Sequence, residues 1–252
     1  MRGPQAFADH LDQHFYHPRS DAHSNALCLG VLDDLLRHCA PLAEKAARGE
    51  VVAQLNHTVT VSFQNWNIDL AVGPPPGAPL PPENGAPISF AAPAVVEVAL
   101  EAKGVMTEHG KARRNRLRDL QAFHSHAHSY NQNVIAVGMV VVNASAVFWS
   151  PTRAETDVTE HRNIDRLAAE TVDLFRNLPL RNAASAGPGL EAAAVLVVKH
   201  DNLRKNPNLP ADAPASSDTV LVTKPPAPQT GDPLHYATMI QRVCTAYRER
   251  RA

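Results

Sequence analysis

Two apolar stretches give the clearest structural signal in this chain: Val95-Val96-Glu97-Val98-Ala99-Leu100-Glu101-Ala102-Lys103 and, upstream of it, Asn67-Ile68-Asp69-Leu70-Ala71-Val72. Both have the character of buried strands, and both carry charged residues near their ends. An ionised side chain in a buried strand is costly unless it is paired or bound to a metal. Asp69, Glu101 and Lys103 therefore mark a candidate functional site.

These three residues have the chemistry of a cation and phosphate site. Glu101 and Lys103 point to the same face of their strand, because side chains alternate with a period of two. Asp69 supplies a second carboxylate from a neighbouring strand, and the Ala102 carbonyl adds a further oxygen ligand. We expect Mg²⁺, and Mn²⁺ also suits oxygen ligands. The alternative is a strand-edge ion pair between Glu101 and Lys103, with Asp69 at the end of a hairpin.

The periodicity of the chain predicts an α/β fold with a mixed central sheet flanked by helices. A helical pattern begins at a Ser20-Asp21 cap, breaks at Pro41 and ends at Gly49. Strands are expected at 58–63, 66–72, 94–102, 134–142 and 193–199, with a tight turn at Gln64-Asn65, and helices at 107–130, 159–178 and 233–250. Residues 1–20 read as an ordered arm or a frayed end, segment 73–93 as a loop and segment 201–232 as largely loop.

Asp69 in one strand and Glu-x-Lys (Glu101, Lys103) in the next, followed by a basic helix and a buried strand, resemble the PD-(D/E)XK nuclease superfamily over residues 26–142. Ile68 stands where the family name has proline. The resemblance implies a restriction-endonuclease-like core within one domain, 1–252, and an elaboration from about 146 to 252. It makes Asp69 and Glu101 metal ligands and Lys103 the residue that positions water. A further acid from the first helix would be Glu44 or Glu50.

The resemblance implies a metal-dependent DNA endonuclease that leaves a 5′-phosphate and a 3′-hydroxyl, used in restriction or anti-phage defence. Double-stranded DNA is the expected substrate, and cutting both strands favours a homodimer. Two alternatives stay open. One is a structure-specific or repair nuclease on the same fold. The other is a DNA-binding effector subunit that a partner subunit activates.

A run of basic residues follows the Glu-x-Lys strand and is expected on one helix: His109, Lys111, Arg113, Arg114 and Arg116. Such a run would contact the phosphates of DNA, which give affinity without sequence information. The alternative is a solvated charged face. His124, His126 and His128 are read as a solvated or hydrogen-bonded helix end, because no zinc-protease pattern surrounds them.

The bulk composition sets limits. The net charge of -1 requires any nucleic-acid surface to be local. The three cysteines Cys28, Cys39 and Cys244 are read as reduced core thiols of a cytoplasmic protein, and no apolar run is long enough to cross a membrane. The chain has no phosphate-binding P-loop and no dinucleotide-binding glycine pattern, so ATP-driven translocation is not encoded in it.

Overall fold

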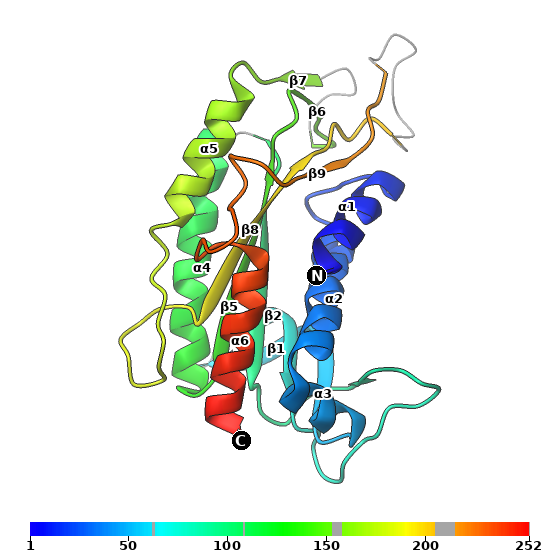
Figure 1. Cartoon of the computed structure of the whole chain (residues 1–252), viewed down its shortest axis with the longest axis vertical. Helices are drawn as coiled ribbons and strands as arrows, with labels where there is room; N and C mark the ends of the chain where they lie inside the picture. Colours follow the sequence, from blue (N-terminus) through cyan, green and yellow to red (C-terminus); the bar gives the residue numbers. More distant parts are fainter. Residues whose placement is uncertain (62–63, 108, 153–157, 205–214, 252) are drawn as a thin grey trace.

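The computed structural model describes residues 1–61, 64–107, 109–152, 158–204 and 215–251 (Figure 1). Within these residues the chain forms six helices and nine strands. The helices are α1 (Gly3–Gln13), α2 (Asp21–His38), α3 (Ala40–Ala47), α4 (His109–Tyr130), α5 (Ile164–Phe175) and α6 (Tyr236–Arg251). The strands are β1 (Val52–Val61), β2 (Gln64–Gly73), β3 (Ser89–Phe90), β4 (Val98–Val105), β5 (Ile135–Asn143), β6 (Val147–Trp149), β7 (Val158–Glu160), β8 (Ala192–Lys199) and β9 (Val220–Val222).

The described strands build one seven-stranded mixed sheet in the order β3-β1-β2-β4-β5-β8-β9, and β6 and β7 pair separately. β1, β2 and β4 form an antiparallel meander, whereas β4, β5 and β8 run parallel. Parallel neighbours need a crossover, and α4 and α5 lie in the two crossovers. The predicted α/β class with a mixed sheet is thus confirmed.

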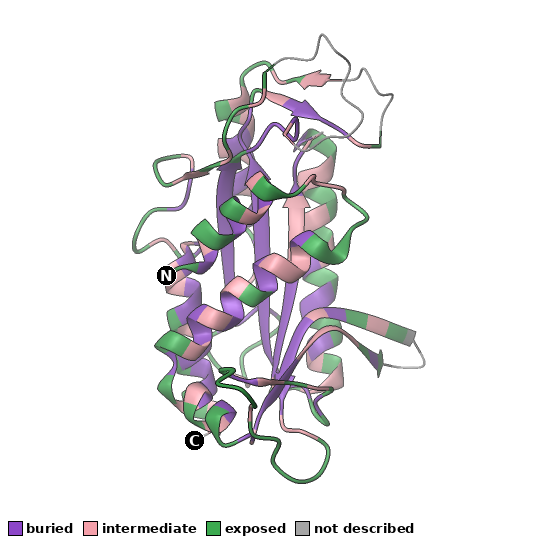
Figure 2. Cartoon of the chain, turned by 90° about the vertical axis from the view of Figure 1, so that its right-hand side faces the viewer, coloured by how far each residue is buried: buried purple, intermediate pink, exposed green. Residues whose placement is uncertain are grey.

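Helices cover both faces of the sheet (Figures 1 and 2). α1, α2, α3 and α6 pack on one face, where they meet Leu70 and Leu100. α4 and α5 pack on the other face, where they meet Ala71 and Ala99. Neighbouring residues of one strand thus point to opposite cores, as expected from the two-residue period of a strand. β5 is buried along its whole length, as expected for a strand covered on both faces.

Two N-terminal features were predicted with different success. The break at Pro41 is confirmed, because α2 ends at His38 and Pro41 lies in the first turn of α3. The arm expected at 1–20 is wrong, since residues 3–13 form α1. The backbone N–H groups of Arg2 and Gly3 donate to the buried carboxylate of Asp34 in α2. A cap supplied from 31 residues away leaves no local signal in the sequence.

Several strand boundaries also differ from the prediction. Gln64 and Asn65 are not a turn, because they already belong to β2 and pair with Val61 and Thr60. β4 starts at Val98 and runs two residues past Lys103. The helix expected at 159–178 is shorter, and residues 158–160 form β7 instead. The loops expected at 73–93 and 201–232 each contribute one short edge strand, β3 and β9.

The cysteine prediction is wrong for two of the three residues. Cys39, between α2 and α3, forms a disulfide with Cys244 of α6, while Cys28 is a buried free thiol. Their separation of 205 residues hides this pairing in the sequence. Reduced cysteines therefore no longer argue for a cytoplasmic location. No helix in the described part of the chain is long and apolar enough to cross a membrane.

Candidate functional site

Asp69 lies where the sheet forks. The pairing of β2 with β4 ends at Leu70 and Leu100, so Asp69 and Glu101 are the first opposed residues beyond the last pair. The Ala102 backbone N–H donates to Asp69 Oδ2 at 2.7 Å. The carboxylate thereby satisfies a strand N–H that has lost its ladder partner. Because the N–H and C=O of one strand residue point to the same edge, the Ala102 carbonyl also points into this fork.

The ribbon of β1 and β2 changes its packing at the same point. Leu70 packs on the core of α2, whereas Ile68, two residues away, packs on the core of α4. Opposite Asp69 in the register, Asn56 has φ 52°, in the left-handed region that few non-glycine residues adopt. The regular pairing of β1 with β2 is thus interrupted at the level where β2 stops pairing with β4.

Glu101 and Lys103 lie together on β4, as their spacing predicted. Lys103 Nζ donates to Glu101 Oε1 in a short ion pair. Glu101 is only 8 % exposed, and its second oxygen, Oε2, is buried and has no hydrogen-bond partner. A buried carboxylate oxygen without a partner is costly, so this atom is available for a cation.

Burial is the main cause of a raised pKa in both carboxyl groups. Burial, followed by the charge of Asp69, raises the pKa of Glu101 to about 7, against the opposing effect of Lys103. Burial also raises the pKa of Asp69, although the Ala102 N–H and Lys103 favour its charged form. Lys103 favours the charged form of both groups, but the three side chains of Asp69, Glu101 and Lys103 still carry a net negative charge when both carboxyls are ionised. Such a set is stabilised by a cation.

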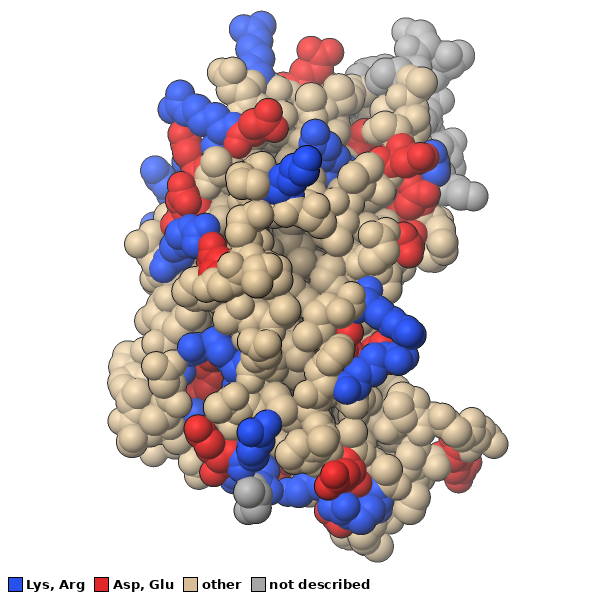
Figure 3. All heavy atoms as spheres, viewed as in Figure 1, with Lys and Arg blue, Asp and Glu red and all other residues tan. Residues whose placement is uncertain are grey.

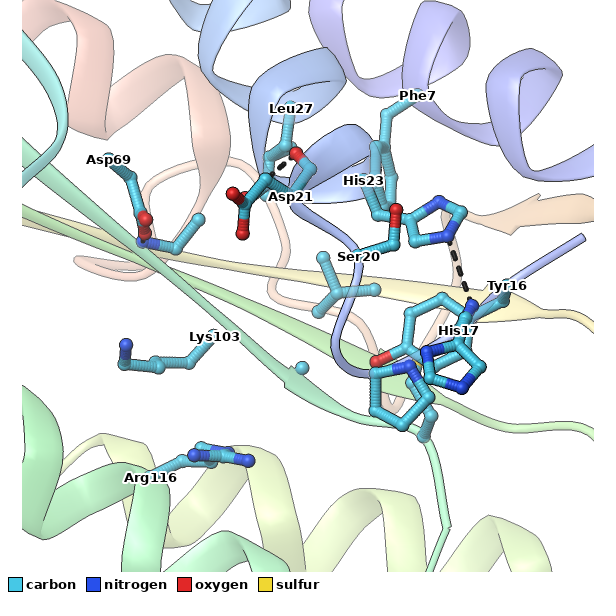
Figure 4. Close-up of a pocket in the computed structure, with 16 residues that line it drawn as sticks. Phe7, Tyr16, His17, Ser20, Asp21, His23, Leu27, Asp69, Lys103 and Arg116 are labelled. Carbon is cyan, nitrogen blue, oxygen red and sulfur yellow. Dashed lines mark hydrogen bonds between the residues drawn. The ribbon is translucent and has the colours of Figure 1, made fainter. Parts of the chain in front are cut away.

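A cavity of about 220 Å³ opens beside this trio between the sheet and the helices (Figure 4). Asp69, Ala102 and Lys103 line one side of it. Asp21, in the first turn of α2, lines the opposite side, and its carboxylate faces Asp69. The charge of Asp21 contributes to the raised pKa of Asp69. Arg116 reaches the cavity from α4.

The acidic residues suggested by the resemblance do not lie at this cavity. Glu44 is exposed on α3, and Glu50 forms an ion pair with Arg48 at 2.6 Å. Glu97, which shares the alternation of Glu101 in the sequence, precedes the start of β4 and contacts Tyr247 and Arg251 of α6. Asp21 is the acid that sequence reasoning missed. The sequence analysis did identify Ser20-Asp21 as a helix cap, but it assigned Asp21 no role beyond that cap.

The basic run divides into residues with different roles. His109 is buried, with Nε2 2.7 Å from the Asn143 carbonyl, so it fixes the start of α4 and is not placed to meet DNA. Arg113 donates to Glu170 of α5 at 3.0 Å and joins the two helices. Lys111 and Arg114 are exposed. Arg116 lines the cavity and pairs with Asp119 at 2.8 Å. Figure 3 shows both signs of charge interspersed on the face it displays.

Of the three histidines near the end of α4, His126 is exposed, whereas the other two are not. His124 is buried, and His128 contacts the buried Glu191 at 3.3 Å. His126 lies near the Trp66 ring. Glu191 also accepts from Arg181 and Arg250, so His128 belongs to a network that joins α4, β8 and α6. The prediction that they hold no metal stays a prediction.

The donor set at the fork fits a hard divalent cation with an incomplete protein shell. Among the described residues, no three His, Cys, Asp or Glu side chains converge as a metal-binding group. The fork itself offers two carboxylates and one backbone carbonyl. Mg²⁺ is commonly held by one or two carboxylates and completes its octahedral shell with water and substrate phosphate oxygens. The unpartnered Glu101 Oε2 is the observation that favours this fit.

Comparisons with protein-family models, with curated proteins and with solved structures found no match to this chain.

Proposed function

We propose that this protein is a metal-dependent endodeoxyribonuclease with a restriction-endonuclease-like core, acting in restriction or defence against foreign DNA. The observation that carries the proposal is the fork, where Asp69 accepts from the Ala102 N–H on one side and Glu101 pairs with Lys103 on the neighbouring strand. The meander β1, β2, β4 followed by α4 and the parallel strand β5 supports it, because this is the element order that the resemblance implies.

Asp69, Glu101 and the Ala102 carbonyl would hold the cation. A bound Mg²⁺ would neutralise the attacked phosphate and lower the pKa of a coordinated water. Lys103, freed from Glu101 once that carboxylate has another partner, would orient the attacking water through its Nζ. Arg116, on the far side of the cavity from Asp21, would hold a non-bridging phosphate oxygen. Asp21 would repel the phosphate unless a cation lies between them. Its carboxylate would therefore interact with the cation and its bound water.

Each chain contributes one fork, so a homodimer would place two forks on the two strands of a duplex. Lys111 and Arg114, exposed on α4, would contact the backbone phosphates next to the cut.

Cleavage assays on plasmid and phage DNA, with Mg²⁺ or EDTA, test the proposal. Glu101→Gln and Lys103→Ala serve as site variants, and Glu44→Gln serves as a matched surface control. We expect metal-dependent cleavage by the wild type and by Glu44→Gln, and its loss in both site variants. Cleavage that persists in both site variants would place the active site elsewhere. Metal-independent DNA binding without cleavage would favour the partner-activated subunit.

A further inference from the structure

The antiparallel ribbon of β1 and β2 continues beyond the fork. From His57 paired with Ile68 to Val61 paired with Gln64, the two strands bond only to each other, because β4 pairs no further than Leu70. The ribbon projects from the body of the molecule (Figure 2). One face of it packs on α4, where Val59 and Ile68 are buried and the Trp66 ring lies 5.3 Å from that of Phe123. The ribbon is therefore held in a fixed orientation relative to the fork.

The other face of the ribbon carries four exposed polar side chains: Thr58 and Thr60 from β1, and Asn65 and Asn67 from β2. Thr60 Oγ1 donates to Asn65 Oδ1 at 3.0 Å, and Thr58 Oγ1 contacts Asn67 Oδ1 at 3.5 Å. Each bond uses one lone pair of an amide oxygen, so that oxygen can accept a second hydrogen bond and the Nδ2 group can still donate. Residues 54–68 include no Asp, Glu, Lys or Arg.

We propose that this face enters the major groove of duplex DNA and reads base edges beside the cleaved phosphate. The inference rests on the proposed nuclease function and names its recognition element. The major groove admits a two-stranded ribbon, and asparagine amides pair with the N6 and N7 edge of adenine. Asn67 is two residues from Asp69, roughly 7 Å along the strand. The read bases would therefore lie within a few base pairs of the cut.

The chemistry of the face favours base edges over a protein partner. Protein interfaces bury an apolar centre, whereas here the apolar residues already pack on α4 and the outer face is uncharged and polar. Phosphate contacts from α4 carry no sequence information, so an enzyme that selects a site needs a second element of this kind.

The test compares the double variant Asn65→Ala/Asn67→Ala with the control Asn133→Ala/Asn177→Ala, in which two exposed asparagines away from the ribbon are replaced. Duplexes bound in EDTA are selected from a randomised pool and sequenced, and cleavage with Mg²⁺ is mapped on phage DNA. Circular dichroism and thermal unfolding establish that each variant is folded.

We expect the wild type and the control to enrich the same site, with adenine at one or two positions near the cut. The ribbon variant should lose about tenfold or more of that preference and keep its Mg²⁺-dependent cleavage of other sequences. Unchanged enrichment in the ribbon variant would overturn the inference and leave the nuclease proposal intact. Enrichment of no sequence by the wild type would also overturn it. If the wild type neither binds nor cleaves DNA, both this inference and the nuclease proposal are overturned.

Discussion

Ala102 donates its backbone N–H to Asp69 Oδ2 at 2.7 Å at the point where their two strands have stopped pairing. This bond gives Asp69 two roles. Its oxygen replaces the missing ladder acceptor, and its charge faces Glu101 and Lys103. The structural role and the chemical role can be separated by substitution, because an asparagine keeps the acceptor and loses the charge.

We expect Asp69→Asn to fold with a stability within about 1 kcal/mol of the wild type, because its amide oxygen still accepts from Ala102. Asp69→Ala should lose roughly 1–3 kcal/mol, since it leaves a partly buried N–H without a partner. Both should lose metal binding and at least about a hundredfold of cleavage rate. Urea unfolding and calorimetric titration with Mg²⁺ or Mn²⁺ measure the two effects. Cleavage retained by Asp69→Asn would remove Asp69 from the site.

The raised pKa of Glu101, about 7 against an ordinary 4.5, makes the metal-free protein less stable as pH rises. Between these two values the folded state binds more protons than the unfolded state, so the free energy of unfolding falls with increasing pH. Glu101→Gln removes the titration. At pH 8 in EDTA we expect the free energy of unfolding of this variant to exceed that of the wild type by at most about 3 kcal/mol. Near pH 5 the two values should be equal.

The measurement is the free energy of unfolding in urea at both pH values, with Glu44→Gln as a control that should show no such difference. Saturating Mg²⁺ should then stabilise the wild type at pH 8 and not Glu101→Gln, because binding to the folded state alone raises stability. Equal pH dependence in wild type and Glu101→Gln would contradict the assignment of the raised pKa.

The central sheet could be predicted because each of its strands carries a local signal. The stretches around Asp69 and Glu101 are apolar with a period of two, and β5 is a continuous apolar run. The spacing of Glu101 and Lys103 also fixed their common face, since that depends on strand geometry alone. These are properties of neighbouring residues, and a single sequence records them.

The remaining features depend on residues far apart in the chain. Asp34 caps α1 across 31 residues, and Cys39 meets Cys244 across 205. Asp21 reaches the cavity only because α2 packs over the fork. The sequence shows that His109 and Arg113 are basic residues. It does not show that His109 hydrogen-bonds to Asn143 or that Arg113 pairs with Glu170. Contacts of this kind arise from tertiary packing, so the family resemblance led to Glu44 and Glu50 and not to Asp21.

Asp21 offers a direct test of this difference. We expect Asp21→Asn to weaken metal binding and to lower the cleavage rate by roughly tenfold, because it removes a charge that faces Asp69 across the cavity. The asparagine keeps a residue that suits the first turn of a helix, so α2 should persist. Glu44→Gln and Glu50→Gln, measured in the same titrations, should have no effect. An effect of Glu44→Gln or Glu50→Gln with none for Asp21→Asn would reverse the assignment.

Three arginines of α4 should respond differently to alanine. Arg116→Ala should lower cleavage by roughly tenfold or more, since its guanidinium lies at the cavity. Arg114→Ala should weaken binding to all sequences alike and reduce its dependence on salt, as expected for a phosphate contact. Arg113→Ala should leave DNA binding unchanged and cost up to about 1 kcal/mol of stability, because it breaks the partly exposed ion pair with Glu170. Anisotropy titrations over a range of salt concentrations distinguish the three outcomes.

The disulfide between Cys39 and Cys244 ties the start of α3 to α6 and closes most of the chain into one loop. A cross-link of this span restricts the unfolded chain strongly, so its loss should cost about 2–5 kcal/mol. For a protein of this length we expect a reductant to lower the melting temperature by roughly 5–15 °C. Cys28→Ala, which replaces the buried free thiol, should keep that sensitivity, whereas Cys39→Ala/Cys244→Ala should melt at a low temperature with or without reductant. An equal melting temperature of the wild type in oxidising and reducing buffer would show that the bond does not form, and would restore the reading of all three cysteines as core thiols.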